Sequence, residues 1–464
     1  MTTELYAPLL QAAQAHALDY LHRQPSRHVG ARASRGDLIA ALQVPLSQQG
    51  EPSASVLGLL AAQGERGAIA SGSGRYFGFV IGGSYPVALA ADWLVSSWDQ
   101  NAGIYATSPV SAVIEEIAAR WLLDLFDLPR EAQVGFVTGC QMANFTCLAA
   151  ARHHVLARVG WDVEADGLQG APRVNVVTSA ESHVTIDVAL RYLGFGKRAA
   201  CRVESDEQGR MRADRLRDVL ATLEGPTILC AQAGNVNTGA FDPLPELAAM
   251  AREHDAWLHV DGAFGLWARA SRHLTARADG IGLADSWATD AHKWLNVPYD
   301  CGVAIVRHAE AHRAAMTSAA AYLIQTDGAE RDAVDWGPEF SRRARGVPVY
   351  ATLRMLGRDG VEALIVRCCA RARQMATLLA AEPGVAVLND VVLNQVLVRF
   401  GDDDSSTRAV VSGVQADGTC WLSGTTWHGM AAMRISVSNW TTSEQDIELS
   451  AAAIIRVFRQ LRVG

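Results

Sequence analysis

The chain has 464 residues, which is enough for a large hydrophobic core and two or three domains. Hydrophobic residues make up 49% of it and charged residues 19%, a composition that excludes a disordered chain. The net charge of −8 is mild for this length and no basic cluster with interleaved aromatic residues stands out, so we expect no nucleic-acid partner.

In chain order, residues 1–85 are predicted to form an N-terminal arm of helices and loops. Residues 109–128 have apolar side chains at helical spacing and a proline beyond their end, which predicts a buried helix. From about residue 134, short β runs alternate with helices. The predicted strands are residues 134–137, 174–178, 227–231, 257–260 and 303–306, and the predicted helices are residues 142–159, 183–193 and 244–253.

This alternation predicts the α/β class, with a mostly parallel sheet covered by helices on both faces. We assign it to a large domain of residues 86–356. From Gly357 onward the pattern changes, and residues 357–464 are predicted to form a smaller α+β domain. Its predicted elements are a helix at residues 361–379, strands at 391–400 and 433–438, and a closing helix at 443–461.

Several other classes of protein are disfavoured. The eight cysteines show no metal-ligand spacing, so we predict no metal site and expect reduced thiols in a cytoplasmic protein. No apolar run approaches membrane-spanning length, so we expect no membrane partner. The N-terminus has no basic region ahead of an apolar one, so we expect no signal peptide.

Two charged residues stand in apolar surroundings. Asp261 ends the apolar run Ala256-Trp-Leu-His-Val-Asp, and Lys293 follows about one strand–helix–strand step later in Asp290-Ala-His-Lys-Trp. A buried carboxylate is costly unless it is paired, and a pyridinium N–H is a suitable partner. Pyridoxal phosphate (PLP) chemistry needs such a pair, because the lysine holds the cofactor aldehyde as a Schiff base and the aspartate keeps the ring nitrogen protonated. The alternatives are a surface lysine, and an aspartate in a helix cap or an ion pair.

Three further segments follow predicted strands. Cys140 and Gln141 open a long helix in Thr138-Gly-Cys-Gln-Met-Ala-Asn, where backbone N–H groups form an anion site suited to the cofactor phosphate. His183 could stack on the pyridine ring, although a histidine at a strand end is more often structural. Asn235 could hydrogen-bond the ring hydroxyl, or it could serve a turn that contains residues at positive φ.

Together these motifs resemble the group II PLP-dependent amino-acid decarboxylases, which include aromatic amino-acid, glutamate, histidine and diaminobutyrate decarboxylases. The resemblance runs from about Phe77 to Asn439. It rests on Phe-Gly-Phe-Val, Ser108-Pro109 before a long helix, Asn-Val-Asn-Thr-Gly-Ala-Phe-Asp, His-Val-Asp-Gly-Ala and Asp-Ala-His-Lys-Trp. It implies PLP fold type I with a seven-stranded type of sheet, and a homodimer whose active site lies at the subunit interface.

The resemblance also implies roles for single residues. Lys293 is the expected Schiff-base lysine, Asp261 the partner of the pyridinium nitrogen and His183 the ring-stacking residue. Ala263 is expected on the other face of the ring, and His292 near the phosphate and the substrate carboxylate. The other expected cofactor-binding residues are Cys140, Gln141, Asn235 and Asp290.

The implied reaction is the decarboxylation of an L-amino acid to an amine and CO2, with Lys293, Asp261 and His183 as its catalytic residues. One departure leaves alternatives open. The mobile loop of the family, here about residues 326–340, contains no tyrosine for the last proton transfer, and Ala333 stands near the expected place. Tyr322, just before the loop, could substitute for it.

Loss of this tyrosine accompanies aldehyde-forming variants in the family. An aldehyde synthase or an aminotransferase on the same scaffold is therefore the alternative, and a non-catalytic binding protein is a further one. Two positions outside the main motifs add weaker expectations: Arg434 faces the substrate, and Gly103 leaves room in the side-chain pocket. The charged loop residues are expected on a solvent-exposed lid; they are Glu330, Arg331, Asp332 and Asp335.

Overall fold

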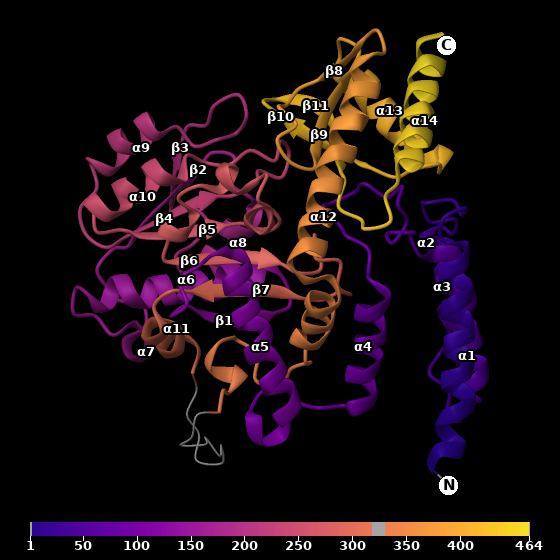
Figure 1. Cartoon of the computed structure of the whole chain (residues 1–464), viewed down its shortest axis with the longest axis horizontal. Coiled ribbons are helices and arrows are strands. Elements are labelled where there is room, and N and C mark those ends of the chain that lie inside the picture. Colours follow the sequence, from indigo (N-terminus) through magenta and orange to yellow (C-terminus); the bar gives the residue numbers. More distant parts are fainter. Residues whose placement is uncertain (1, 318–329, 464) are drawn as a thin grey trace.

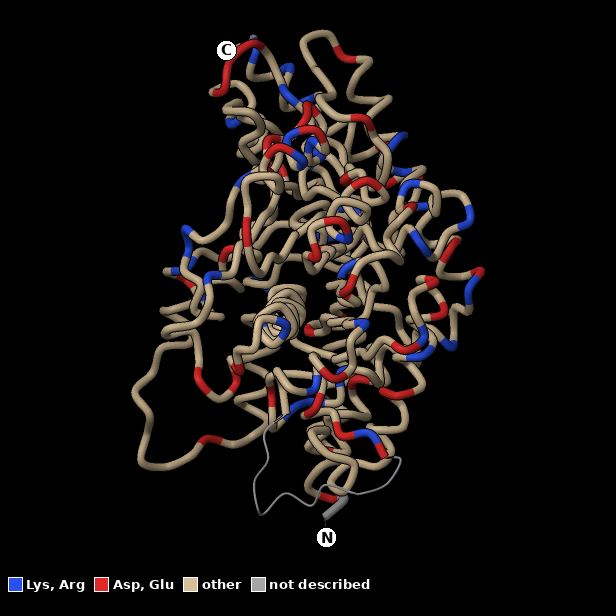
Figure 2. The backbone as a smooth tube through the Cα atoms, turned by 90° about the vertical axis from the view of Figure 1, so that its left-hand side faces the viewer, with Lys and Arg blue, Asp and Glu red and all other residues tan. Residues whose placement is uncertain are grey.

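A large sheet forms the centre of the molecule, a smaller sheet lies beside it, and a group of N-terminal helices stands along one side (Figure 1). The computed structural model describes residues 2–317 and 330–463. Within these residues, no helix is both long enough and apolar enough to cross a membrane. Lys and Arg residues are interspersed with Asp and Glu residues along the backbone (Figure 2).

The large sheet has seven strands in the order β1-β7-β6-β5-β4-β2-β3. Strand β7 runs antiparallel to both of its neighbours, and the other neighbouring pairs are parallel. The predicted α/β class and mostly parallel sheet are confirmed. The strands are β1 (Gln133–Val137), β2 (Asn175–Ser179), β3 (Ala200–Val203), β4 (Thr227–Gln232), β5 (Trp257–Asp261), β6 (Ser286–Asp290) and β7 (Gly302–Val306).

Strands β3 and β6 are absent from the sequence-based prediction. Strand β3 is a four-residue edge strand with two exposed positions, so it lacks a long apolar run. Strand β6 is fully buried although three of its five residues, Ser-Trp-Ala-Thr-Asp, are polar. These polar side chains can be buried because they have hydrogen-bond partners inside the protein. A strand of this kind carries no alternating or continuous apolar pattern that a sequence reading can detect.

Helices cover both faces of the large sheet, and α6 is the most central of them. It contacts β1, β4, β5, β6 and β7, and its buried face is rich in alanine and cysteine, small residues that allow close packing. The helices around this sheet are α5 (Pro109–Phe126), α6 (Cys140–Ala157), α7 (Val163–Asp166), α8 (Val184–Tyr192), α9 (Ala213–Leu220), α10 (Leu244–Glu253) and α11 (Ala309–Met316).

The C-terminal part contains an antiparallel four-stranded sheet in the order β10-β11-β9-β8. Helix α12 (Gly346–Ala380) connects it to the large sheet, and Gly357 inside this helix has a φ of +61° that interrupts the helical geometry. The predicted boundary at residue 357 falls on this break, and the division into three domains stays a prediction. The other elements are β8 (Val385–Val387), β9 (Gln395–Phe400), α13 (Asp404–Asp417), β10 (Ser423–Trp427), β11 (Met430–Ser436) and α14 (Glu444–Val463).

The N-terminal helices expose much apolar surface. Helices α1 and α3 lie beside each other, apart from the rest of the chain in the view of Figure 1. Exposed large apolar side chains include Leu5, Leu10, Leu18, Leu59, Leu60, Trp93 and Leu94. The helices of this region are α1 (Thr2–Arg23), α2 (Arg35–Leu42), α3 (Ser53–Gly67) and α4 (Pro86–Trp98).

Candidate active site

The residues singled out from the sequence meet at one edge of the large sheet. Strand β5 ends at Asp261 and strand β6 at Asp290, and Lys293 follows three residues after β6. Helix α6 begins at Cys140, directly after β1. Because ligands of parallel sheets bind at the carboxyl ends of their strands, this edge is where a cofactor site is expected.

Lys293 is held by a carboxylate. Its Nζ lies 3.0 Å from Oδ2 of Asp290, and its side chain is 19% exposed. Burial alone disfavours the ammonium form, but the negative charge of Asp290, with a smaller contribution from Asp261, raises the pKa of Lys293. The chain contains one other lysine, Lys197, which is exposed. Lys293 is therefore the one buried amine available for a covalent bond to an aldehyde.

The loop after Lys293 is fixed by Asn296, which the sequence analysis missed. Its Oδ1 accepts hydrogen bonds from the N–H groups of Gly83 at 2.6 Å and Trp440 at 3.0 Å, and its Nδ2 donates to the carbonyl of Ser438 at 3.0 Å. Any Cβ at Gly82 would lie 2.0 Å from the Lys293 carbonyl oxygen. Asn296 has a φ of +57°. The only sequence signal for this turn is an asparagine two residues before a proline, in Asn-Val-Pro, and it is weak.

Asp261 is buried, and both oxygens of its carboxylate have contacts inside the protein. Oδ1 accepts the N–H of Ala263 at 3.1 Å and lies 3.5 Å from the Cys140 sulfur, and Oδ2 accepts from Nδ2 of Asn144 at 3.2 Å. These contacts fix the orientation of the carboxylate. Burial is the main reason that the pKa of the Cys140 thiol lies well above its ordinary value, so that the thiol keeps its proton.

His183 caps the N-terminus of α8 near this carboxylate. Its Nδ1 lies 2.8 Å from Oγ1 of Thr185, which fixes the ring. Burial lowers the pKa of His183, and the positive charges of Lys293 and Arg434 act in the same direction, against the opposing charge of Asp261. His183 is therefore a neutral imidazole at pH 7, as a flat stacking partner should be.

His292 is a second neutral imidazole at the site. Burial lowers its pKa, and the backbone N–H of Cys301 donates to its Nδ1 at 3.0 Å. Nδ1 must then be unprotonated, so Nε2 carries the proton, and this atom lies 3.4 Å from Oδ1 of Asp290. The ring stacks on Tyr299 with centroids 4.2 Å apart.

The start of helix α6 is close to the lysine loop. Gly139 has an extended backbone, and a Cβ there would lie 3.3 Å from Cε1 of His292. The N–H of Cys140 donates to Oδ1 of Asp290 at 2.6 Å, so Asp290 joins the helix start to the lysine. Gln141 is half-buried in the first turn of α6. The assignment of Cys140 and Gln141 to a phosphate stays a prediction.

The remaining predicted positions differ in how they relate to the site. Asn235 uses its side chain in its own turn, because its Oδ1 accepts from the N–H groups of Asn237 at 2.8 Å and Thr238 at 3.2 Å. This is the turn alternative that its sequence left open. Arg434 on β11 is half-buried, and among the described residues its Nε has no hydrogen-bond partner. Burial lowers the pKa of Arg434.

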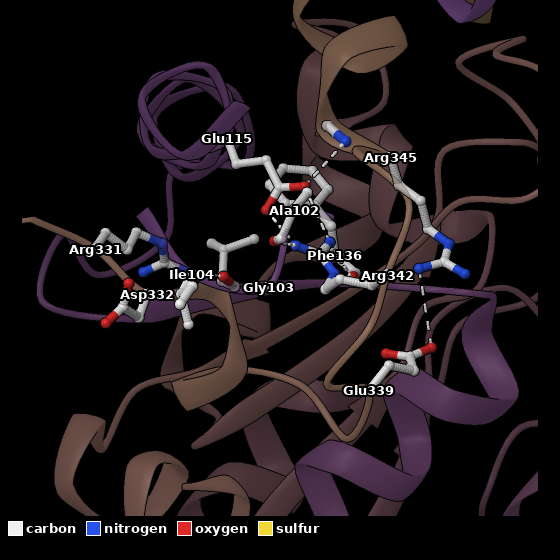
Figure 3. A network of polar contacts seen from close by, with 12 residues as sticks. Ala102, Gly103, Ile104, Glu115, Phe136, Arg331, Asp332, Glu339, Arg342 and Arg345 are labelled. Atoms are coloured by element: carbon white, nitrogen blue, oxygen red, sulfur yellow. Dashed lines mark hydrogen bonds and ion pairs between the residues drawn. The ribbon is translucent and has the colours of Figure 1, made fainter. Parts of the chain in front are cut away.

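The expectation of a solvent-exposed lid is wrong for three of its four charged residues. Two of these three, Arg331 and Asp332, are drawn in Figure 3. Asp332 and Asp335 are buried, and Arg331 is half-buried with its guanidinium 4.8 Å from the ring of Trp336. Only Glu330 is exposed. The reason is that the segment after residue 330 packs on β1 and on residues 101–105. Tyr322 and residues 326–329 lie outside the described residues.

A family comparison accounts for this arrangement. The model of the pyridoxal-dependent decarboxylase conserved domain matches residues 37–400. The chain belongs to the pyridoxal-dependent decarboxylase family. The resemblance drawn from the motifs is thereby confirmed.

Curated relatives within the pyridoxal-dependent decarboxylases act on different amino acids. L-2,4-diaminobutyrate decarboxylase of Rhizobium meliloti (strain 1021) is 32% identical over 320 residues, or 68% of this chain and 62% of that protein. Aromatic-L-amino-acid decarboxylase of Bacillus atrophaeus is 27% identical over 391 residues, or 81% of this chain and 79% of that protein. The match therefore spans about three fifths of the diaminobutyrate enzyme.

Solved structures confirm PLP fold type I. The Oryza sativa protein TDC, crystallised with PLP and tryptamine, superposes with a TM-score of 0.91 at 21% identity, covering 98% of each chain. Rhodiola rosea 4-hydroxyphenylacetaldehyde synthase superposes with a TM-score of 0.88 at 22% identity, covering 100% of this chain and 99% of that one. At these identities the likeness speaks for the fold.

The residues present fit PLP, the cofactor of this decarboxylase family. A buried amine, a carboxylate that accepts two N–H groups, a neutral imidazole and the start of a helix surround one strand edge. The extended glycine at position 139 keeps the approach to the helix start free of a side chain. These are the groups that an aldehyde, a pyridine ring and a phosphate require.

Proposed function

We propose that this protein catalyses the PLP-dependent decarboxylation of an L-amino acid to the amine and CO2. The observation that supports this most is the convergence of Lys293, Asp261 and His183 at one buried strand edge. Lys293 is the amine that holds the cofactor, and Asp261 is the partner of its ring nitrogen. His183 and Ala263 would hold the ring between them.

The cofactor, when bound, supplies an electron sink for the electron pair that remains at Cα when CO2 leaves. The chain's own residues orient the reactants and control protons. Asp261 would hold a proton at the ring nitrogen. A buried carboxylate needs an opposite charge beside it, and the protonated ring nitrogen would supply that charge. Arg434 offers its half-buried guanidinium, whose Nε has no hydrogen-bond partner within residues 2–317 and 330–463, to the substrate carboxylate. Lys293, freed by the substrate amine, is then available to move a proton.

An aldehyde synthase is the second candidate. The observation that favours it is that residues 326–340 contain no tyrosine, with Ala333 near the place where the family resemblance implies one. In that reaction the amino acid, O2 and water yield an aldehyde, CO2, ammonia and hydrogen peroxide. Without a tyrosine to protonate Cα, the electron pair stays available to oxygen for longer.

One experiment separates these two reactions. Purified holoenzyme is incubated with single L-amino acids, including diaminobutyrate, aromatic and acidic ones, while CO2, O2 uptake and product masses are recorded together. We expect amine and CO2 in equal amounts and no O2 uptake. Equal amounts of aldehyde, peroxide and CO2 would instead establish the synthase. CO2 release that persists in Lys293→Ala would contradict the assignment of the lysine.

We propose further that two copies form a homodimer with the active site at their interface. A groove of 750 Å³ lies between α1 and α4, with an apolar lining that includes Leu18, Leu21 and Trp93. The same groove reaches Gly82 and Tyr299, which lie next to the lysine loop. An unpaired apolar surface of this kind marks an interaction site.

Sedimentation velocity should give a dimer for the parent protein. The double variant Leu18→Glu, Trp93→Glu should sediment as a monomer, and a double variant that remains a dimer would contradict the assignment of this groove to the dimer interface.

We propose a cytoplasmic location for the protein. All eight cysteines are free thiols in the structure, and seven of them are buried. Free thiols persist in a reducing compartment.

A further inference from the structure

A chain of buried polar side chains runs from Asp261 into the core behind the active site. Asn144 donates from its Nδ2 to Oδ2 of Asp261 at 3.2 Å, and its Oδ1 lies 2.9 Å from Nε2 of His259. Nδ1 of His259 lies 2.9 Å from Oγ of Ser286, which in turn lies 2.9 Å from Nε1 of Trp257. Asn144, His259 and Ser286 are completely buried and Trp257 is 2% exposed.

The direction of every hydrogen bond in this chain is fixed at Asp261. Nδ2 of Asn144 donates to the Asp261 carboxylate, so Oδ1 of Asn144 faces His259 and accepts the proton on its Nε2. Nδ1 of the neutral His259 ring is then unprotonated and accepts from the hydroxyl of Ser286, which itself accepts the indole N–H of Trp257. His259 in turn holds the Asn144 amide with its Nδ2 toward Asp261.

The same amide also reaches the stacking histidine. Nδ2 of Asn144 donates to Oγ1 of Thr185 at 3.2 Å, and this oxygen lies 2.8 Å from Nδ1 of His183. The backbone N–H of Thr185 donates to the same Nδ1 at 3.4 Å, so His183 carries its proton on Nε2. Asn144 is thus the branch point between the carboxylate and the imidazole of the site.

His259 takes part in the chain as a neutral ring. Burial lowers its pKa to about 4, so it holds one proton at pH 7. A cationic imidazole at this position would donate from both nitrogens, and Ser286 could no longer give its proton to Nδ1. It would also place a second positive charge behind Asp261 and compete with the cofactor's ring nitrogen for that carboxylate.

We propose that Trp257, Ser286, His259 and Asn144 form a positioning relay that holds the Asp261 carboxylate in the orientation needed by the cofactor's ring nitrogen, and that holds Thr185 against His183. The relay residues are positioning residues, because they act through Asp261 and His183. This inference rests on the assignment of Asp261 to the ring nitrogen under the proposed function.

The relay differs from ordinary core packing in what its loss changes. Removing a residue from a purely structural network lowers the stability of the protein but leaves the pKa of the cofactor's ring nitrogen unchanged. Removing a residue from the relay should change that pKa. The test therefore uses holoenzyme reconstituted with PLP labelled with ¹⁵N in the ring, and reads the ¹⁵N chemical shift of the resting enzyme against pH, together with PLP retention on dialysis.

Asn144→Leu removes both donors at the branch point, and His259→Phe removes the group that orients the Asn144 amide. We expect the ring nitrogen to titrate at lower pH in both variants, and the PLP dissociation constant to rise about 10- to 100-fold, the range for a lost hydrogen bond to a charged group. His312→Gln is the matched control. His312 is equally buried and bonds the Trp336 carbonyl at 3.1 Å, so its loss should reduce stability without moving the ¹⁵N titration.

Ser286→Ala is a smaller change and keeps the test decisive if the larger variants do not fold. It removes the donor to Nδ1 of His259, so the ring's proton should redistribute between its two nitrogens, which ¹⁵N-labelled histidine reports. An unchanged ring-nitrogen titration in folded Asn144→Leu or His259→Phe, or an unchanged His259 tautomer in Ser286→Ala, overturns the relay. A wild-type ring nitrogen that is neutral at pH 7 would instead overturn the assignment of Asp261 itself.

Discussion

At the scale of single residues, the chemistry of the site depends on which of its buried groups are charged. Lys293 stays cationic because Asp290 outweighs the cost of burial, whereas His183 and His292 are neutral because burial outweighs their carboxylate neighbours. The sequence singles out Lys293 and Asp261, since charged residues in apolar strand ends are rare, and their roles stay predictions. It cannot predict Asn144 or Asn296, because an asparagine in a helix or after a tryptophan carries no local sign of its partners.

Lys293→Ala should abolish covalent capture of the cofactor. We expect no visible chromophore and no borohydride-fixed mass adduct, and a fall in turnover of about 10⁴-fold or more, as for loss of a covalent catalyst. Intact-mass spectrometry after borohydride reduction is the measurement. Lys197→Ala is the matched control, because these two are the chain's lysines and Lys197 is exposed. An adduct that survives in Lys293→Ala, or vanishes in Lys197→Ala, would show that the wrong lysine was chosen.

At the scale of elements, the segment that follows residue 330 is locked onto residues 101–105 (Figure 3). The N–H of Ala102 donates to the carbonyl of Arg342 at 2.9 Å, and the N–H of Tyr105 donates to Oδ1 of Asp332 at 2.7 Å. The guanidinium of Arg342 forms a two-point ion pair with Glu115 of α5, with distances of 2.8 and 2.9 Å. A Cβ at Gly103 would lie 2.3 Å from the carbonyl of Phe340.

This contact explains what the sequence could and could not predict about elements. Helix α10 was predicted with its observed bounds, because both its apolar spacing and its end signals are local. The loop at about residues 326–340 is expected to be a lid, because its charged residues are typical of solvent-facing loops. The burial of Asp332 and Arg331 depends on distant partners, the N–H of Tyr105 for Asp332 and Gln133 for Arg331, and a local pattern cannot report them.

Breaking the Arg342–Glu115 pair should destabilise the protein strongly. Glu115→Gln leaves a guanidinium that is 2% exposed without its counter-charge, and removing one partner of a buried pair costs about 3–5 kcal/mol. Arg343→Ala is the neighbouring control. Arg343 pairs with Asp92 near the surface, where its side chain is 41% exposed, so its loss should cost about 1 kcal/mol or less. Urea unfolding of the two holoenzyme variants measures the difference, and equal losses would contradict a structural role for the buried pair.

At the scale of the whole molecule, the sequence predicts the fold because its motifs lie at successive strand ends and their order defines the scaffold. What it does not give is the surface left by the N-terminal helices. Helices α1 and α3 have apolar residues on faces that are exposed in the single chain, and only their arrangement in space shows which of these residues lie together. Buried titratable groups are a second property of the whole fold, because their pKa values depend on everything packed around them.

Acid should unfold this protein mainly through two buried histidines. Burial lowers the pKa of His259 to about 4 and that of His312 to about 3, whereas an unfolded histidine titrates near about 6.5. As the pH falls below 6.5, the unfolded chain binds more protons than the folded one, so the free energy of unfolding decreases. By pH 4 each histidine should have removed about 3 kcal/mol.

Asp242 acts in the opposite direction, so the two contributions can be separated. Burial raises its pKa to about 6, and the folded state therefore binds a proton before the unfolded state as the pH falls from 6 to 4. We expect the urea midpoint of holoenzyme to fall between pH 7 and 4.5. His312→Gln should lose less stability than the parent over this interval, and Asp242→Asn should lose more. Cofactor release at low pH is common to all three proteins and cancels in the comparison, so parallel curves would show that neither residue titrates as its burial requires.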